Sequence, residues 1–326
     1  MQRDHGGNLD WARAHWGGDD WIDLSTGINR HPWVPGPLST EALRALPQKS
    51  AESRLIAVAA RHFGCPPESV LPMAGATAPI QALPRILPPG RAAVLTPSYN
   101  EHAASLRAAG WQVADAPDLS AMAGADLAVV VNPNNPDGRE FAPADLRQLA
   151  ARVGLLVVDE SFADPRPDLS IAPDLPANAV VLRSFGKFWG LAGLRLGFAV
   201  AQPRMLARLR DFSGPWSVSG PALEIASEAM ADRHWAEDTI TYHAEGAMRL
   251  DMLALRAGWE VAGGTHLFRL FDTPDAGAAQ AHLARHRIWS RRFPYSDRWL
   301  RLGIPGNRAE WDRVGAALAA AAPPAP

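Results

Sequence analysis

The sequence has little that would indicate a disulfide-stabilised, membrane-spanning or nucleic-acid-binding protein. Its 326 residues include one cysteine, Cys65, which excludes an internal disulfide and a metal cluster built on cysteines. No apolar run approaches the roughly 20 residues of a membrane-spanning helix, and the first residues lack the apolar core of a signal peptide. The formal net charge of −2 predicts no basic surface for nucleic acid or anionic membranes. We therefore expect a cytoplasmic protein.

What is present is ordinary for a globular protein with a substantial core. Hydrophobic residues make up 47% of the chain and charged residues 20%. The 29 prolines and 27 glycines are dispersed, so they mark turns and loops and not a disordered tract. A chain of this length suits two lobes, or one large α/β unit with a smaller appendage.

Between about residues 50 and 205, short apolar runs alternate with amphipathic segments. The runs lack polar alternation, which is typical of strands buried on both faces of a mostly parallel sheet. The segments between them predict helices, and the alternation is the βαβ rhythm of an α/β domain. We expect strands over 92–96, 127–131, 155–158, 179–182 and 197–200, and helices over 51–63, capped by Ser50, over 77–87, capped by Thr77, and over 142–153.

Beyond about residue 205 the pattern changes to longer helical stretches, followed by strand-like pieces at 265–271 and 299–302. This change predicts a second, smaller α+β domain. We expect an N-terminal arm over 1–35 that contributes to the small domain, a large domain over 36–205, and a small C-terminal domain over 206–326 whose last residues fray.

Residues suited to ligand binding follow the first expected strands, where ligands bind in such sheets. Gly75-Ala76-Thr77 precedes an expected helix, whose N-terminal N–H groups can bind a phosphate. By itself this pattern is usually only a turn and a helix cap. Tyr99 follows the next strand and can stack on a planar cofactor, although an ordinary loop aromatic is about equally expected there.

Two further strands end in an Asn-Pro loop and in a carboxylate. The loop contains Asn132-Pro133 and Asn135-Pro136, and turn chemistry accounts for much of its composition. Asp159 follows the run 155–158, and a carboxylate at the end of a buried strand is costly unless it is paired. A structural carboxylate and a functional one are about equally expected at this position.

The stretch from Ser184 to Phe198 places Lys187 among Phe, Trp and Leu side chains and several glycines. Partial desolvation disfavours the ammonium form, and a neutral amine is what covalent chemistry with an aldehyde requires. Ser184 and Arg195 can hold a phosphate through a hydroxyl and a guanidinium. For a lone lysine, a side chain that only carries its amine to solvent is the more common outcome.

Taken in chain order, these segments resemble the fold-type-I pyridoxal-phosphate (PLP) enzymes, the aspartate aminotransferase superfamily, over nearly the whole chain. The resemblance implies a homodimer with a PLP cofactor and no metal. It implies that Lys187 binds PLP covalently, that Asp159 pairs with the protonated ring nitrogen, and that Asn135 donates to the phenolic oxygen. Tyr99 would stack on the ring, and with Lys187 and Asp159 it completes the predicted catalytic set. The phosphate would be held by Gly75, Ala76, Thr77, Ser184 and Arg195.

Within the superfamily the chain resembles the histidinol-phosphate aminotransferase branch, and there the decarboxylases of phosphorylated amino acids. The features are His5-Gly6-Gly7-Asn8, the segment Asp23 to Asn29, and Phe162, where most aminotransferases carry tyrosine. The resemblance implies that Arg301 binds a substrate carboxylate and that Arg291 or Arg292 binds a substrate phosphate. A solvated surface charge is the alternative for that pair. Further candidates around the substrate are His5, Asn8 and Asn29.

Two positions depart from the family pattern, and two other functions stay open. Leu46 stands where related enzymes often have a tyrosine that reaches the neighbouring subunit, and Gly186 stands where a serine or threonine usually precedes the lysine. The alternatives are an aminotransferase of the histidinol-phosphate type and a non-catalytic PLP-binding regulator. Retention of Lys187, Asp159 and Arg301 together argues against the regulator.

Overall fold

The computed structural model describes residues 5–321; the first four residues of the expected arm and the last five residues of the chain, which were expected to fray, lie outside the described residues. The chain divides into two compact units. Unit 1 comprises residues 5–32, 136–138 and 236–321, and unit 2 comprises residues 33–135 and 139–235. The boundary expected near residue 205 differs from this division, because Leu206 and Leu209 pack into the core of unit 2.

Unit 2 is built on a seven-stranded sheet with the order β2-β8-β7-β6-β5-β3-β4. Neighbouring strands are parallel except at β8, which runs antiparallel to both β2 and β7. The five expected strands are therefore confirmed, and the sheet is mostly parallel as predicted. The strands are β2 (Val70–Met73), β3 (Arg91–Leu95), β4 (Gln112–Ala116), β5 (Leu127–Val131), β6 (Leu155–Asp159), β7 (Ala179–Ser184) and β8 (Gly197–Ala201).

The helices of unit 2 lie between these strands, as the βαβ rhythm predicts. Two predicted caps are wrong: α3 begins at Lys49 with Gln48 as its N-cap, and Thr77 is the first residue of α4 and not its cap. Ser50 therefore lies inside the first turn of α3. The helices are α2 (Thr40–Arg44), α3 (Lys49–Phe63), α4 (Thr77–Ile86), α5 (Asn100–Ala108), α6 (Pro143–Ala150), α7 (Phe185–Phe188), α8 (Pro203–Ser213) and α9 (Gly220–Ala229).

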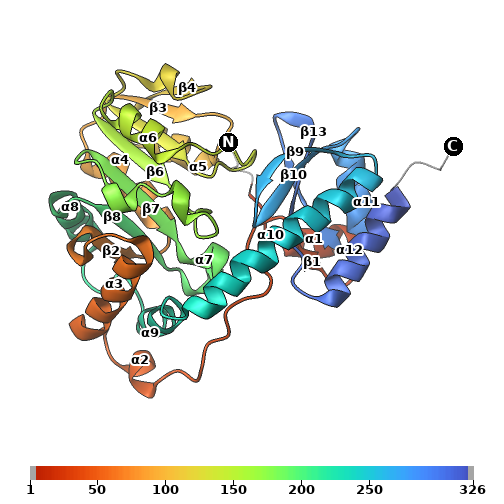
Figure 1. Ribbon diagram of the computed structural model, residues 1–326, viewed down its shortest axis with the longest axis horizontal. Coiled ribbons are helices and arrows are strands. Elements are labelled where there is room, and N and C mark those ends of the chain that lie inside the picture. Colours follow the sequence, from red (N-terminus) through yellow and green to blue (C-terminus); the bar gives the residue numbers. More distant parts are fainter. Residues whose placement is uncertain (1–4, 322–326) are drawn as a thin grey trace. The chain divides into compact units, whose positions relative to one another are not determined.

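Helices cover both faces of this sheet (Figure 1). Leu83 of α4, Leu106 of α5 and Leu209 of α8 share one apolar cluster with alternate strand residues such as Ala199. On the other face, Phe63 of α3 contacts Phe198 of β8, with ring centroids 5.3 Å apart. Because each fully buried leucine contributes about 1.5–3 kcal/mol, this two-sided core holds the strand ends in a fixed register.

Unit 1 contains an antiparallel sheet with the order β12-β13-β10-β9 and a short parallel pair, β1 and β11. The strand expected over 265–271 is instead a hairpin, because β9 ends at Thr265 and β10 begins at Phe268. The elements are α1 (Leu9–Trp16), β1 (Ile22–Asp23), α10 (Arg233–Arg256), whose first residues belong to unit 2, β9 (Glu260–Thr265), β10 (Phe268–Asp272), α11 (Ala276–Arg285), β11 (Ile288–Trp289), β12 (Arg291–Phe293), β13 (Ser296–Gly303) and α12 (Arg308–Ala321).

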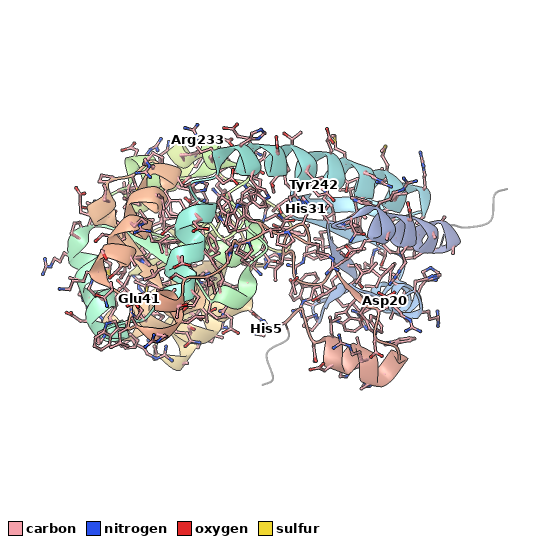
Figure 2. All side chains as sticks on the ribbon, turned by 90° about the horizontal axis from the view of Figure 1, so that it is seen from below. His5, Asp20, His31, Glu41, Arg233 and Tyr242 are labelled. Carbon is pink, nitrogen blue, oxygen red and sulfur yellow. The ribbon has the colours of Figure 1, made fainter. Side chains whose placement is uncertain are left out.

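The core of unit 1 forms where α10, α11 and α12 pack on this sheet, through residues such as Leu250, Leu283 and Val314. His31 lies beside Tyr242 of α10 (Figure 2), with ring centroids 5.7 Å apart. Within residues 5–321, no helix combines the length and apolar character needed to cross a membrane.

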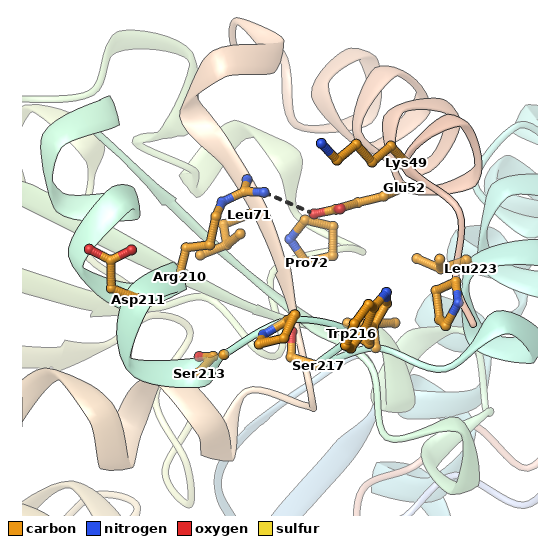
Figure 3. A pocket seen from close by; sticks show the side chains of 14 residues that line it. Lys49, Glu52, Leu71, Pro72, Arg210, Asp211, Ser213, Trp216, Ser217 and Leu223 are labelled. Carbon is orange, nitrogen blue, oxygen red and sulfur yellow. Dashed lines mark hydrogen bonds and ion pairs between the residues drawn. The ribbon is translucent and has the colours of Figure 1, made fainter.

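A pocket of about 490 Å³ lies in unit 2 between the start of α3 and the loop after α8 (Figure 3). Lys49, Glu52 and Arg210 line it, together with Trp216, which is 59% exposed and has a φ of +56°. The predicted site residues lie elsewhere in the described chain, so this pocket is not the predicted active site.

Candidate active site

The predicted cofactor residues follow neighbouring strands of the unit 2 sheet. Val131 at the end of β5 pairs with Asp159 at the end of β6, which pairs with Leu182 of β7. The loops after these strands therefore meet at one edge of the sheet, the place where open α/β sheets bind ligands. Asn135 lies in the loop after β5, and Lys187 lies in α7 directly after β7.

Gly75, Ala76, Ser184 and Arg195, which are predicted to hold the phosphate, lie close together. Gly75 has a φ of +78°, and a Cβ atom there would lie 2.8 Å from Nη2 of Arg195. Ser184 pairs with Gly197, and a Cβ at Gly197 would lie 2.4 Å from the backbone nitrogen of Ala76. Thr77 opens the 10-residue helix α4, so the Arg195 guanidinium, the backbone of Ser184 and the N–H groups of the helix start lie close together, an arrangement suited to a phosphate.

The backbone around Arg195 explains the glycine at position 186. Arg195 has a φ of +54°, and its Nη1 donates to the carbonyl oxygen of Ala192 at 3.0 Å. A Cβ at Gly186 would lie 2.7 Å from Cα of Ala192. The loop that positions Arg195 therefore leaves no room for the serine or threonine expected before the lysine.

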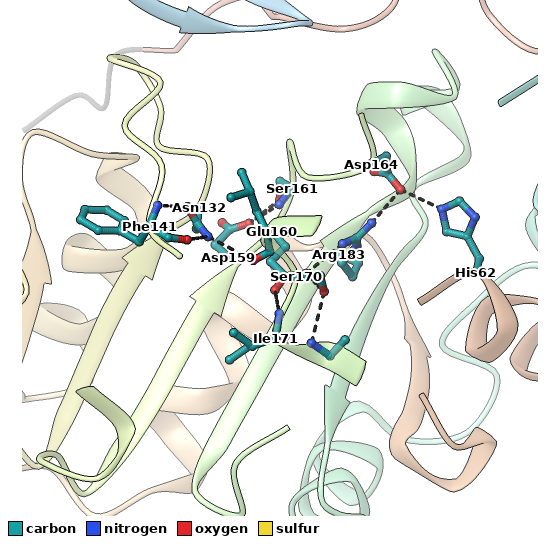
Figure 4. A network of polar contacts seen from close by, with 12 residues as sticks. His62, Asn132, Phe141, Asp159, Glu160, Ser161, Asp164, Ser170, Ile171 and Arg183 are labelled. Atoms are coloured by element: carbon teal, nitrogen blue, oxygen red, sulfur yellow. Dashed lines mark hydrogen bonds and ion pairs between the residues drawn. The ribbon is translucent and has the colours of Figure 1, made fainter. Parts of the chain in front are cut away.

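Asp159 is a buried carboxylate with three hydrogen-bond donors (Figure 4 shows its surroundings). Nε2 of His102 lies 2.8 Å from Oδ2, while Ser161 donates to Oδ1 through its backbone nitrogen at 3.0 Å and its Oγ at 2.5 Å. Burial acts to raise the pKa of Asp159, but the hydrogen bond and charge of His102 and the Ser161 bonds outweigh it and hold the pKa below its usual value. The carboxylate is therefore ionised at neutral pH.

His102 was missed by the sequence reasoning. Its position in the sequence could have indicated it. His102 lies three residues after Tyr99, in the first turn of α5, the helix that follows β3. The ring centroids of Tyr99 and His102 are 6.1 Å apart and their planes are nearly perpendicular. His102 therefore contacts two of the three predicted catalytic residues.

Glu160, the residue after Asp159, belongs to a separate ion network in the same view (Figure 4). Arg183 of β7 donates to Glu160 and to Asp164, both at 2.8 Å. Nε2 of His62 from α3 lies 3.2 Å from Asp164. Since removal of one partner from a buried ion pair is strongly destabilising, this network fixes the ends of β6 and β7 and with them the positions of Asp159 and Lys187.

Lys187 lies near the buried ring of Phe162, with Nζ 5.6 Å from the ring centroid. The amine therefore has an aromatic neighbour where most aminotransferases carry a phenol. A phosphate cradle, an ionised carboxylate and an amine beside an aromatic ring fit the donor and acceptor groups of PLP.

The predicted substrate residues lie in unit 1, and four of them line one pocket of about 570 Å³. These are His5, Asn8, Arg291 and Arg292. Ser290 also lines this pocket; it is 1% exposed, and its Oγ has no hydrogen-bond partner among the described residues. A pocket with guanidinium and hydroxyl donors is suited to an anion.

Arg301 lies across the β12–β13 ladder from Arg291. Both guanidinium groups contact the ring of Phe293, at 5.4 Å for Arg291 and 6.0 Å for Arg301, measured to the centroid. Burial, together with the charge of Arg291, lowers the pKa of Arg301 to about 9. Two cations held this close favour a bound anion, because an anion relieves both the desolvation and the repulsion.

The segment from His5 to Asn8 is attached to the loop after β1. The backbone nitrogen of Gly7 donates to Oγ of Ser25 at 2.7 Å, and a Cβ at Gly6 would lie 2.4 Å from the Ser25 oxygen. Nη2 of Arg301 donates to that same carbonyl oxygen at 2.6 Å. The N-terminal segment and Arg301 are therefore both held by Ser25.

Two of the candidate asparagines have structural hydrogen bonds. Asn8 caps α1 by accepting from the backbone nitrogen of Trp11 at 3.3 Å, while it also lines the pocket. Asn29 is 2% exposed, and its Oδ1 accepts from the backbone nitrogen of His31 at 2.7 Å. Their roles toward a substrate stay predictions.

Residues 19–318 match the family model of aminotransferase class I and II. The chain belongs to this family. Threonine-phosphate decarboxylase of Sinorhizobium sp is 43% identical over 97% of both chains, and that of Pseudomonas aeruginosa is 41% identical, also over 97% of both. The crystal structure of histidinol-phosphate aminotransferase from Sinorhizobium meliloti in complex with pyridoxal-5'-phosphate has a TM-score of 0.78 and 20% identity, covering 97% of this chain and 94% of that one.

Membership of the aminotransferase class I and II family agrees with the α/β fold and with the order of the strand-end residues in unit 2. Among the residues that the structure describes, no three histidine, cysteine or carboxylate side chains are placed to hold a metal ion. Unit 2 thus brings Asp159, His102 and Tyr99 into contact, and unit 1 by itself places Arg291 and Arg301 opposite one another.

Proposed function

We propose that this protein is a PLP-dependent carboxy-lyase that converts L-threonine O-3-phosphate to (R)-1-aminopropan-2-yl phosphate. The observation that carries the proposal is the pairing of Arg291 with Arg301 across one ladder, beside the pocket of unit 1. A substrate with a phosphate and a carboxylate offers each guanidinium an anion. The full-length relatives named threonine-phosphate decarboxylase support this substrate.

PLP, when bound, withdraws electrons from the α-carbon of an amino acid attached to it. In this chain Lys187 would hold the aldehyde carbon through its amine and would carry a proton on Nζ. Asp159, ionised and held by His102 and Ser161, keeps the ring nitrogen protonated. Arg195, Ser184 and the start of α4 hold the phosphate. With phenylalanine at position 162, Asn135 is left to donate to the phenolic oxygen.

On the substrate side, Arg301 binds the carboxylate and Arg291 the phosphate. The two arginines of β12 lie on different faces of the strand. Arg291 shares a face with Arg301. Arg292 is exposed and lies near Gly277 of α11. This favours Arg291 for the phosphate. By binding the carboxylate, Arg301 would orient the bond between that group and the α-carbon. Lys187 would carry the proton that replaces the lost CO₂ at the α-carbon.

The second candidate function is an aminotransferase of the histidinol-phosphate type, favoured by the shared fold and family. Histidinol phosphate carries a phosphate but no carboxylate, so it would use one of the two arginines. A single assay separates the candidates: purified protein, PLP and threonine phosphate, with CO₂ release measured with and without 2-oxoglutarate. CO₂ release without the oxo acid supports the decarboxylase, and conversion of 2-oxoglutarate to glutamate without CO₂ release contradicts it. Neither product, with threonine phosphate or with histidinol phosphate, favours a PLP-binding regulator.

We also propose a cytoplasmic homodimer that serves cobalamin biosynthesis. Large apolar side chains of unit 2 are exposed either in the pocket of Figure 3 or next in sequence to residues that line it, and their burial against a second copy would lower the free energy. They are Leu46 (59% exposed), Phe212 (51%) and Trp216 (59%). Sedimentation of the wild type and of Trp216→Asp tests the dimer: a monomeric wild type contradicts it, and a dimeric wild type with a monomeric variant supports this face.

A further inference from the structure

Trp33 and Trp235 mark the two places where the chain passes between the units, apart from the short segment 136–138. Trp33 is the first residue of unit 2 after Pro32, and Trp235 is its last residue before α10 continues into unit 1. Both side chains are half-buried. Their contacts within unit 2 therefore fix where the chain enters and leaves it.

Asp232 binds both of these tryptophans. Nε1 of Trp33 donates to Oδ2 of Asp232 at 3.2 Å, and the backbone nitrogen of Trp235 donates to Oδ1 at 3.1 Å. Asp232 directly precedes α10, so the second bond is an N-cap, and the carboxylate also suits the positive end of the helix dipole. Because Trp33 and Asp232 are 199 residues apart in the chain, the tertiary fold brings them together.

Both tryptophans also contact Trp189, the second residue after Lys187. The indoles of Trp235 and Trp189 are stacked, with ring centroids 5.2 Å apart and an interplanar angle of 17°. The backbone nitrogen of Trp33 donates to the carbonyl oxygen of Trp189 at 3.0 Å. Phe188 packs edge-on against Trp235, with centroids 5.6 Å apart. Phe188 and Trp189 are each 1% exposed, so these contacts lie in a close-packed core.

The short helix α7, which carries Lys187, depends on this packing. It has four residues, and a single turn is not stable through its own hydrogen bonds. A close-packed core has little free volume, so a shift of Trp189 would move α7 with it. The position of Lys187 therefore follows from the contacts of Phe188 and Trp189.

We propose that Trp235 and Asp232 are positioning residues for Lys187. Trp235 holds Trp189 by stacking, and Asp232 fixes Trp235, so that Nζ of Lys187 keeps the position that its bond to the cofactor aldehyde requires. That bond forms between Nζ and the aldehyde carbon, and the aldehyde oxygen leaves as water with both protons of the neutral amine. The proposal rests on the proposed assignment of Lys187 to the aldehyde, and on no assumption about which reaction follows.

The test is calorimetric titration of the apoprotein with PLP and with pyridoxine 5'-phosphate, which has an alcohol in place of the aldehyde and forms no bond with an amine. Trp235→Ala should weaken PLP binding about 10-fold, the upper end for loss of an aromatic pair. Pyridoxine phosphate should bind within about twofold of the wild type, because it forms no bond to Nζ. Trp235→Phe, which keeps a ring against Trp189, should recover most of the PLP affinity. Asp232→Ala should separate the ligands in the same direction but less, because Trp189 keeps its stacking partner.

Asp275→Ala is the matched control for Asp232→Ala. Asp275 caps α11 of unit 1 in the same way, by accepting from the backbone nitrogen of Ala278 at 2.9 Å. This control should lower thermal stability without separating the two ligands. Trp235→Leu, which keeps more apolar volume, keeps the test available if the alanine variant does not fold. Equal weakening for both ligands, unchanged PLP affinity, or the same separation in the Asp275 variant would overturn the proposal.

Lys187→Ala distinguishes failure of the positioning role from failure of the lysine assignment. It should show the largest loss of preference for PLP over pyridoxine phosphate. If it keeps the wild-type preference, the assignment of Lys187 fails and the positioning role fails with it. If it loses the preference while the Trp235 variants keep it, only the positioning role fails. Neither result depends on whether the chain decarboxylates or transaminates.

Discussion

The two units of this chain treat buried charge in different ways. In unit 2 each buried carboxylate of the site faces a cation or a donor: Asp159 faces His102, and Glu160 and Asp164 face Arg183. In unit 1 the buried Arg301 has Arg291 beside it across the ladder. Paired buried charges hold a fixed geometry. Two neighbouring guanidinium groups, one of which also feels the charge of Asp23, favour a bound anion. The comparison supports the proposed assignment of unit 2 to the cofactor and of unit 1 to the substrate, called here the cofactor half and the substrate half.

The cofactor half is tested most strongly at Lys187. Lys187 and Lys49 are the only lysines in the sequence. Lys187→Ala should lower the decarboxylation rate by about 10⁴-fold or more, because it removes the covalent anchor and a proton carrier. It should also abolish the visible absorbance band of the lysine-bound cofactor. Lys49→Ala, in the pocket of Figure 3, should keep both the band and the rate. A band that persists without Lys187 would remove the lysine from its proposed role.

The substrate half is tested by the two adjacent arginines of β12. Arg291→Ala should raise the KM for threonine phosphate roughly 100-fold, because it takes one partner from a desolvated charge pair. Arg292→Ala should change KM by less than about threefold, since its exposed side chain lies near Gly277. Neither variant should alter the cofactor absorbance band, if unit 1 serves the substrate alone. Equal effects at the two positions would contradict the assignment of the phosphate to Arg291.

These two halves also differ in how far they can be predicted from sequence. Local motifs locate the predicted cofactor residues, because each stands at or just after the end of an uninterrupted apolar strand. These residues are Gly75, Tyr99, Asn135, Asp159 and Lys187. Parallel strands bring such loops to one edge whatever the detail of the packing. The family resemblance then assigns them to a cofactor.

The sequence alone could not show which residues face one another across strands or between distant segments. The choice between Arg291 and Arg292 follows from which one faces Arg301 across β13, and strand register is set by contacts far apart in the chain. His102 escaped notice because its partner, Asp159, is 57 residues away. The expected strand over 265–271 is broken by a tight turn at His266, which apolar composition alone does not reveal.

The difference in buried charge extends to a histidine of unit 1 that stands outside the proposed site. His243 of α10 is 1% exposed, and among the described residues neither of its ring nitrogens has a hydrogen-bond partner. Burial, with the charges of His266 and His31 adding to it, lowers the pKa of His243 to about 3. By contrast, His62 of unit 2 is bonded to Asp164.

The low pKa of His243 makes the free energy of unfolding depend on pH. In the unfolded chain a histidine takes up a proton near pH 6.5, whereas His243 in the fold stays neutral down to about pH 3. The unfolded state therefore binds one more proton in this window, and the free energy of unfolding falls as pH falls, by about 1.4 kcal/mol per pH unit. His243→Leu should remove this contribution, and its stability should decline less steeply than that of the wild type.

Urea denaturation at pH 7, 6, 5 and 4, followed by tryptophan fluorescence, measures this difference in slope. The matched control is His15→Leu, because His15 is an exposed histidine of the same unit. That variant should parallel the wild type across the series, since folding does not bury His15. Parallel curves for His243→Leu and the wild type would show that His243 is hydrated or paired in solution. The contrast between paired charges in unit 2 and an uncompensated imidazole in unit 1 would then fail at this residue.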